Sequence, residues 1–141
     1  LDAIGRRADG IMPDELDRYF IRGASVVAPC DGEIVTRVDG IAENPIGGTN
    51  REALAGNHVV IACEGLEVLL AHFRPGTLLV EEGAAVTAGR VLGEAGNSGN
   101  STEPHLHIHA VRAGSGGVLH GEAVPLTFGG LFPVRNTVFD G

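Results

Sequence analysis

Three histidines alternate along one short segment of the chain, where single apolar residues separate His105, His107 and His109. Side chains of an extended strand alternate between its two faces, so a strand over 105–111 places all three imidazoles on one face. Neighbouring imidazoles then stand roughly 7 Å apart, which allows one to bind a metal ion while the next acts on a bound water molecule. A neutral imidazole is a common zinc ligand and also titrates near neutral pH. The competing interpretation is a solvated polar strand face, for which three histidines in five residues would be an unusual choice.

The other histidines are less informative by themselves. His72 follows the apolar run 68–71, and His58 opens the apolar run 59–61. Taken alone, each is typical of a structural histidine, and His72 also fits a hydrogen-bonded core residue. We assign no function to His120, which lies in a glycine-flanked segment.

The rest of the sequence predicts an all-β domain that positions these side chains. A length of 141 residues corresponds to one domain, and its 22 glycines and seven prolines alternate with runs rich in Val, Leu and Ile. This composition is typical of short strands joined by tight turns in a sandwich or barrel. Strands are predicted in pairs around the turns Asp31–Gly32 and Glu64–Gly65, and a long loop is predicted over residues 39–56.

Charge and cysteine content narrow the function classes. The formal charge is −8, and no basic stripe is present that could neutralise phosphates, so we expect neither nucleic acid nor an anionic membrane as partner. No apolar run reaches the roughly 20 residues of a membrane span. The two cysteines, Cys30 and Cys63, end apolar runs and fit small buried residues, while a disulfide is the alternative if the domain is exported.

The histidines belong to a longer pattern that runs through residues 23–111. In order, it contains Val26-Val27-Ala28-Pro29-Cys30-Asp31-Gly32, Gly56-Asn57-His58, Ala71-His72-Phe73, two Val-x-x-Gly units from Val80 and Val86, and Gly96-Asn97-Ser98-Gly99-Asn100-Ser101-Thr102-Glu103-Pro104-His105-Leu106-His107. This order resembles the lysostaphin/LytM-type zinc metalloendopeptidases, which hydrolyse peptides of bacterial peptidoglycan. The resemblance implies the small β-sandwich or barrel of that family, a duplicated hybrid motif similar to the barrel-sandwich hybrid.

The resemblance also implies roles for individual residues. His107 matches the family's zinc-binding histidine, while His72 and His105 match the two catalytic histidines that polarise the attacking water. The family's remaining two ligands come from an His-x-x-x-Asp motif, which falls here on Pro13 and Asp17, and no histidine precedes His58. The usual ligand set is therefore incomplete in this sequence.

Two interpretations of this departure remain open. In the first, the zinc site is rebuilt with His107, His109 and His58 as ligands, and the domain is a peptidoglycan hydrolase. In the second, the site has decayed, and the domain is an inactive module that binds peptidoglycan or regulates a cell-wall hydrolase. A biotinyl carrier is disfavoured because the chain has no lysine, and a phosphocarrier needs one active histidine rather than a cluster.

We expect an N-terminal arm over residues 1–22, a peptidase-like β core over 23–112 and a C-terminal extension packed on the core over 113–141. The chain starts abruptly at Leu1 without a signal peptide, as an excised piece of a longer protein would. The resemblance implies a location outside the cytoplasm, in the periplasm, the cell envelope or the medium. The sequence gives no indication of the oligomeric state.

Overall fold

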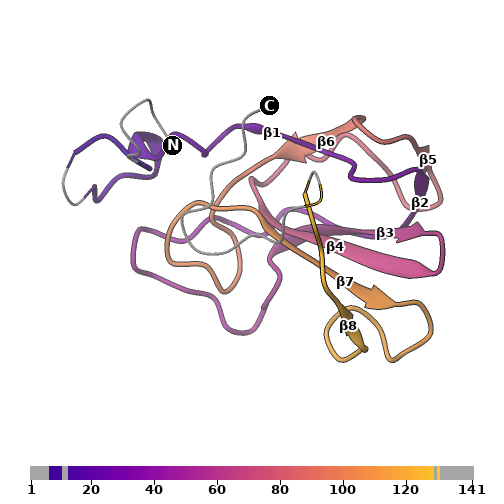
Figure 1. Ribbon diagram of the computed structural model, residues 1–141. Coiled ribbons are helices and arrows are strands. Elements are labelled where there is room, and N and C mark those ends of the chain that lie inside the picture. Colours follow the sequence, from indigo (N-terminus) through magenta and orange to yellow (C-terminus); the bar gives the residue numbers. More distant parts are fainter. Residues whose placement is uncertain (1–6, 11–12, 129, 131–141) are drawn as a thin grey trace.

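The computed structural model describes residues 7–10, 13–128 and 130, and this part of the chain is almost entirely β-structure (Figure 1). In chain order the elements are the 3-10 turn η1 (Leu16–Arg18) and the strands β1 (Ser25–Val27), β2 (Gly32–Val38), β3 (Asn57–Cys63), β4 (Leu66–Phe73), β5 (Ala85–Val86), β6 (Val91–Glu94), β7 (His107–Arg112) and β8 (Ala123–Val124). All strand pairs are antiparallel. The predicted all-β fold is confirmed. Within the described residues, no helix has the length and apolar character needed to cross a membrane.

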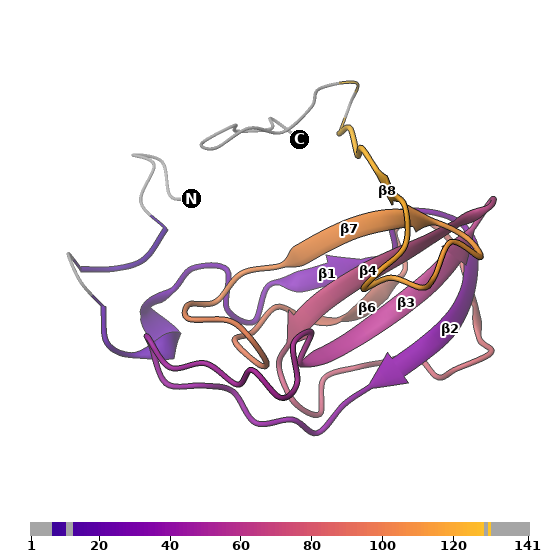
Figure 2. The same ribbon diagram turned by 90° about the horizontal axis from the view of Figure 1, so that it is seen from below.

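The strands form two sheets that pack face to face. One sheet has six strands in the order β5-β2-β3-β4-β7-β8, and the other pairs β1 with β6. Figures 1 and 2 show the small sheet lying over one face of the large one. The main core fills the space between them, and its residues come from both sheets, for example Val26 and Leu92 against Ile61 and Leu70.

The hairpin of β3 and β4 turns at Glu64 and Gly65, as predicted. Both residues have positive φ, 38° and 84°, which is the backbone geometry of the two-residue turn that matches the twist of paired strands. The two strands pair along their whole length from Cys63 and Leu66 to Asn57 and Phe73. They form the centre of the large sheet, next to the strand that carries His107.

The predicted hairpin at Asp31–Gly32 is wrong, because the strands on either side of it belong to different sheets. β1 pairs with β6, and β2 pairs with β3 and β5. Asp31 and Gly32 instead contact other parts of the chain. The Asp31 carboxylate accepts a hydrogen bond from the Ala88 N–H at 2.8 Å, and a Cβ on Gly32 would stand 2.2 Å from the Ala62 carbonyl oxygen. The Asp31–Gly32 sequence therefore lies where the chain passes from the small sheet to the large one.

A second, smaller apolar cluster lies on the opposite face of the large sheet. Its buried members are Val60, Leu69 and Ala71, and Ala55 and Val118 pack on it from two loops. The central strands are thus apolar on both faces. The loops that cover this second face come from residues 39–56 and 113–122, and the histidines lie on the same side of the sheet.

Three further connections hold the periphery. Cys30, just after β1, forms a disulfide with Cys63 at the end of β3, with their Cα atoms 6.2 Å apart. In the N-terminal region, the buried Tyr19 pairs with Ala8 in an isolated β-bridge. After residue 113 the chain returns as β8, which pairs with the edge of β7.

Candidate metal centre and groove

Three imidazoles meet at the end of β4 and the start of β7. His72, His105 and His107 each offer one ring nitrogen within 4.8 Å of the others, and they are the only such group of ligand-type side chains found in the described residues. The ring centroids of His72 and His105 are 4.7 Å apart, and those of His72 and His107 are 5.8 Å apart. The structure thus brings together three of the five histidines that the sequence singled out.

A β-bulge explains how His72 reaches this group. Asn57 pairs with Phe73 and His58 pairs with Ala71, so His72 is an extra residue on β4. Its φ is 70°, in the left-handed region that non-glycine residues rarely occupy. Strict alternation would point His72 to the face opposite Ala71, into the core, and the bulge turns it instead toward His105 and His107. Such strain at a single residue is typical of functional sites.

Backbone carbonyls hold two of the three rings. Nδ1 of His72 lies 2.8 Å from the Ser98 carbonyl oxygen, and Nδ1 of His105 lies 2.9 Å from the Glu103 carbonyl oxygen. A carbonyl only accepts hydrogen bonds, so Nδ1 carries the proton in both rings. In the neutral rings this leaves the Nε2 atoms of His72 and His105 as free acceptors.

The surroundings of His72 and His107 favour the neutral form of both rings. Burial is the main reason that the pKa of His72 is lowered from 6.5 to about 4; the charges of His105, His107 and His58 act in the same direction, against the hydrogen bond to Ser98. The pKa of His107 is also lowered, first by burial and then by its histidine neighbours. Neutral imidazoles with a free nitrogen are the form that binds metal ions.

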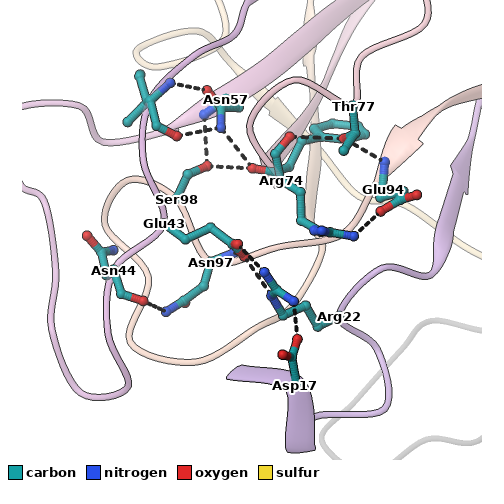
Figure 3. A network of polar contacts seen from close by, with 12 residues as sticks. Asp17, Arg22, Glu43, Asn44, Asn57, Arg74, Thr77, Glu94, Asn97 and Ser98 are labelled. Atoms are coloured by element: carbon teal, nitrogen blue, oxygen red, sulfur yellow. Dashed lines mark hydrogen bonds and ion pairs between the residues drawn. The ribbon is translucent and has the colours of Figure 1, made fainter. Parts of the chain in front are cut away.

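The loop 96–101 positions the group through a buried polar network (Figure 3). The Ser98 hydroxyl donates to the Phe73 carbonyl at 2.8 Å and accepts from the Asn57 N–H at 3.0 Å. The Asn57 side chain donates to the carbonyls of Ile41 and Phe73, and Asn97 donates to the Asn44 carbonyl. Ser98, Asn57 and Asn97 are each fully buried, so these hydrogen bonds fix the loop rigidly behind His72.

Asp17, where the family's aspartate would fall, lies outside the imidazole group. Its carboxylate pairs with the guanidinium of Arg22, and its side chain is 85% exposed. Arg22 also binds Glu43 at 2.6 Å, and Glu43 accepts from the Asn97 N–H at 3.1 Å. Figure 3 shows this series of contacts running from η1 to the loop 96–101. Asp17 therefore takes part in a structural network.

His58 and His109 are placed differently from the three central histidines. His58 is separated from His107 by β4, since both residues pair with Ala71 from opposite sides. Two strand spacings amount to roughly 10 Å, and Nδ1 of His58 contacts the Gly56 carbonyl oxygen at 2.7 Å. The expected convergence of His58 with His107 assumed neighbouring strands; β4 lies between them, and His58 is not among the ring nitrogens that lie within 4.8 Å of one another. His109 lies directly behind His107, with a ring-centroid distance of 5.0 Å.

An apolar groove extends from the histidines across the second face of the large sheet. It consists of two adjoining depressions of about 230 and 340 Å³ that share Leu54, Ala55, Leu69 and Leu119. Leu54 and Leu119, on opposite loops, are 53% and 55% exposed. These two leucines were not predicted as groove residues, because nothing in their local sequence distinguishes them from other loop residues.

The comparisons with known proteins agree with the family resemblance and with the fold. The sequence matches Peptidase family M23 over residues 16–117. The chain therefore belongs to this family. One curated relative is the peptidoglycan DD-endopeptidase ShyA of Vibrio cholerae serotype O1, which is 30% identical over 92 residues. The match covers 65% of this chain and 20% of that relative, so the chain spans about one fifth of the relative's length.

Solved structures show the same fold. A zinc-containing peptidase from Vibrio cholerae superposes with a TM-score of 0.54 at 24% identity, over 76% of this chain and 26% of that one. LytU gives 0.53 at 23% identity, over 72% and 62%. Lysostaphin from Staphylococcus simulans gives 0.51 at 24% identity, over 82% and 47%. At these identities the likeness establishes the lysostaphin-like fold, which the sequence pattern predicted.

Proposed function

We propose that this domain is a zinc metalloendopeptidase that hydrolyses peptide bonds of bacterial peptidoglycan. The observation that carries the proposal is the set of three imidazole nitrogens within 4.8 Å of one another, on rings whose other nitrogens are held by hydrogen bonds. Membership of Peptidase family M23 supports the same reaction class. The proposal thus joins a group of neighbouring imidazoles, one of which would bind the metal while two would act on the water, to a family of peptidases.

The imidazole group is chemically suited to a zinc site. Zinc binds neutral imidazole nitrogen, and the lowered pKa values of His72 and His107 keep these rings unprotonated at neutral pH. His107 is the proposed metal ligand. The chemistry that zinc supplies when bound is polarisation of the scissile carbonyl and a lowered pKa of water.

His72 and His105 act on the water and on the peptide in this proposal. Their Nδ1 protons are bonded to carbonyls, so each presents Nε2 as an acceptor for a hydrogen bond from the attacking water. His72 is buried and resists protonation, so it orients the water. His105 is less buried, and the Ser101 hydroxyl lies 3.1 Å from its Nδ1. We therefore assign to His105 the transfer of the proton to the leaving amine.

The groove indicates the kind of peptide that binds. The depression next to the histidines is lined by Leu69 and Ala71 of β4 and by Leu54 and Leu119 of the two loops. Peptide segments with small, uncharged side chains fit next to Ala71. The formal charge of −8 favours neutral or cationic peptides over anionic ones.

We also propose that the domain works outside the cytoplasm. The Cys30–Cys63 disulfide supports this location, because disulfides persist in oxidising compartments and are rare in the cytosol. The family's action on the cell wall supports it as well.

The test combines zinc content with turnover. The 141-residue chain is purified, its bound zinc is measured, and peptide release from peptidoglycan is assayed for the wild type, His107→Ala and His120→Gln. His120 is an exposed histidine outside the group and serves as the matched control. We expect stoichiometric zinc and turnover in the wild type and the control, and loss of both in His107→Ala. A wild-type chain without zinc or turnover, even after zinc is added, would refute the proposal.

One observation favours a second candidate, an inactive module that binds peptidoglycan or regulates a cell-wall hydrolase. The described ligand group contains no carboxylate, and Asp17 is paired with Arg22 instead. The module predicts that the chain sediments with peptidoglycan sacculi without releasing peptides. On this second hypothesis, His107→Ala sediments with sacculi as well as the wild type does. On the enzyme hypothesis, the wild type releases peptides and His107→Ala does not.

A further inference from the structure

We propose that His109 is a positioning residue that fixes the proton of His107 on Nε2 and so reserves Nδ1 of His107 for the metal. This inference rests on the proposed metal site and adds a residue to it. Nε2 of His107 lies 2.7 Å from Nδ1 of His109, and Nε2 of His109 lies 2.5 Å from the Val118 carbonyl oxygen. The three groups form one continuous chain of hydrogen bonds.

The direction of this chain follows from its last member. The Val118 carbonyl can only accept, so Nε2 of His109 must carry a proton and donate it. A neutral His109 then has a lone pair on Nδ1, which accepts the Nε2–H of His107. His107, when neutral, is left with an unprotonated Nδ1. The carbonyl of Val118 therefore determines which nitrogen of His107 is free, although the two never touch.

The same outcome is reached differently for the other two rings. His72 and His105 donate directly to the carbonyls of Ser98 and Glu103. His107 lies within the paired part of β7, opposite Ala71 of β4. Its ring is held by a second imidazole, that of His109, instead of by a carbonyl. His109 is two residues further along the same strand, so it stands on the same face and within reach. All three rings are thus fixed through one nitrogen.

A ring without such a partner divides its proton between the two nitrogens. Binding at Nδ1 then requires moving that proton, and the ring also rotates more freely. Hydrogen-bond partners that orient metal-binding histidines typically contribute about 10- to 100-fold to metal affinity. Through Val118, His109 also connects His107 to the loop that carries Leu119, a residue that lines the groove.

A direct ligand role for His109 is the main alternative, and the contacts oppose it. Both ring nitrogens of His109 are already engaged, one with His107 and one with Val118. Binding a metal through either would break the corresponding contact. Glutamine separates the two roles, because its amide can accept from His107 and donate to Val118 but is a poor zinc ligand.

The first experiment needs no metal. Long-range 1H–15N correlation spectra of the metal-free chain report which imidazole nitrogen of each histidine carries the proton. We expect His107 to be protonated on Nε2 in the wild type, and exposed His120 to show the mixture of a free imidazole. A wild-type His107 protonated on Nδ1, or as mixed as His120, would overturn the inference whether or not the chain binds zinc.

The second experiment measures zinc affinity by competition with a chelator in the wild type, His109→Gln, His109→Leu and His120→Gln. We expect about 10- to 100-fold weaker binding for His109→Leu and near wild-type binding for His109→Gln and His120→Gln. The inference would be overturned if His109→Leu bound zinc as tightly as the wild type. It would also be overturned if His109→Gln bound zinc as weakly as His109→Leu. Wild type without zinc would refute the proposed function, and the spectra would still decide the role of His109. If His109→Leu is unfolded, the glutamine variant and the wild-type spectra decide.

Discussion

Ser98 and His72 are joined across the site, with the Ser98 carbonyl oxygen 2.8 Å from Nδ1 of His72. The hydroxyl of the same serine donates to the carbonyl of Phe73, the residue that follows His72. One buried residue thus holds both the ring and the backbone of the bulge. The orientation of His72 therefore depends on the loop 96–101 as much as on β4.

The first prediction concerns stability at acidic pH in the metal-free chain. The pKa of His72 is about 4 in the folded state and 6.5 when unfolded, so the unfolded state binds the proton first as the pH falls. Stability from this group is complete above pH 6.5 and decreases by about 3 kcal/mol as the pH falls to 4. His72→Asn removes the titration, and asparagine tolerates the positive φ of this position.

Urea unfolding of both chains at pH 7.5, 5.5 and 4.5, with chelator present, measures this effect. Other titrating groups are shared, so the difference between the two chains isolates His72. We expect the wild type to lose more stability than His72→Asn between pH 7.5 and 4.5. Equal losses in the two chains would show that His72 is not held neutral by burial.

Local sequence patterns were sufficient for the fold and for part of the site. The alternation placed His107 and His109 on one face of a strand, and their ring contact on β7 agrees with it, whereas His105 lies before β7 in an isolated bridge with Gly96. The turn at Glu64–Gly65 was predicted because its geometry depends on those two residues alone. These features need no information from distant parts of the chain.

Features that depend on distant pairing were not predictable in this way. Asp31–Gly32 has a hairpin sequence, but β1 pairs with β6, whose residues lie more than 60 positions later. Whether His58 lies near His107 depends on the number of strands between them, and the sequence alone does not give that number. The bulge at His72 arises from the register of β3 against β4, and one inserted residue reverses the face to which a side chain points.

The second prediction concerns Gly99, which supports the loop behind His72. Its φ is 78°, and a Cβ there would lie 2.3 Å from the Gly56 nitrogen. Gly99→Ala combines backbone strain with a collision, and we expect a loss of about 3 kcal/mol or more together with loss of zinc. Gly76→Ala is the matched control, since its φ is 72° but nothing lies within 4 Å. It should cost about 1 kcal/mol and leave zinc binding intact. Equal effects would mean that the close contact with Gly56 is unimportant.

The third prediction concerns the Cys30–Cys63 disulfide, whose ends are 33 residues apart. Closing a loop of this length restricts the unfolded chain, which contributes about 3 to 4 kcal/mol. Wild type unfolded with reductant present should therefore resemble Cys30→Ala/Cys63→Ala, and the variant itself should not respond to reductant. A wild type whose unfolding midpoint is the same with and without reductant would contradict a stabilising disulfide.

The last prediction separates the two roles open to Asp17. The ion pair of Arg22 with Glu43 has side chains only 17% and 10% exposed, whereas Asp17 is 85% exposed. Arg22→Met leaves Glu43 as a poorly solvated, unpaired carboxylate, so we expect a loss of about 3 kcal/mol. Arg22→Met/Glu43→Gln should recover part of this loss, because the amide oxygen still accepts from the Asn97 N–H without a charge.

Asp17→Asn is the decisive comparison, because it changes an exposed member of the same network. A surface ion pair contributes little, so we expect its unfolding midpoint and its zinc affinity to match those of the wild type. A large fall in zinc affinity without a change in stability would show instead that Asp17 binds the metal, and the network with Arg22 would then have to open for zinc to bind. If Asp17→Asn binds zinc as tightly as the wild type while His107→Ala no longer binds it, the metal is held by the imidazole group without Asp17.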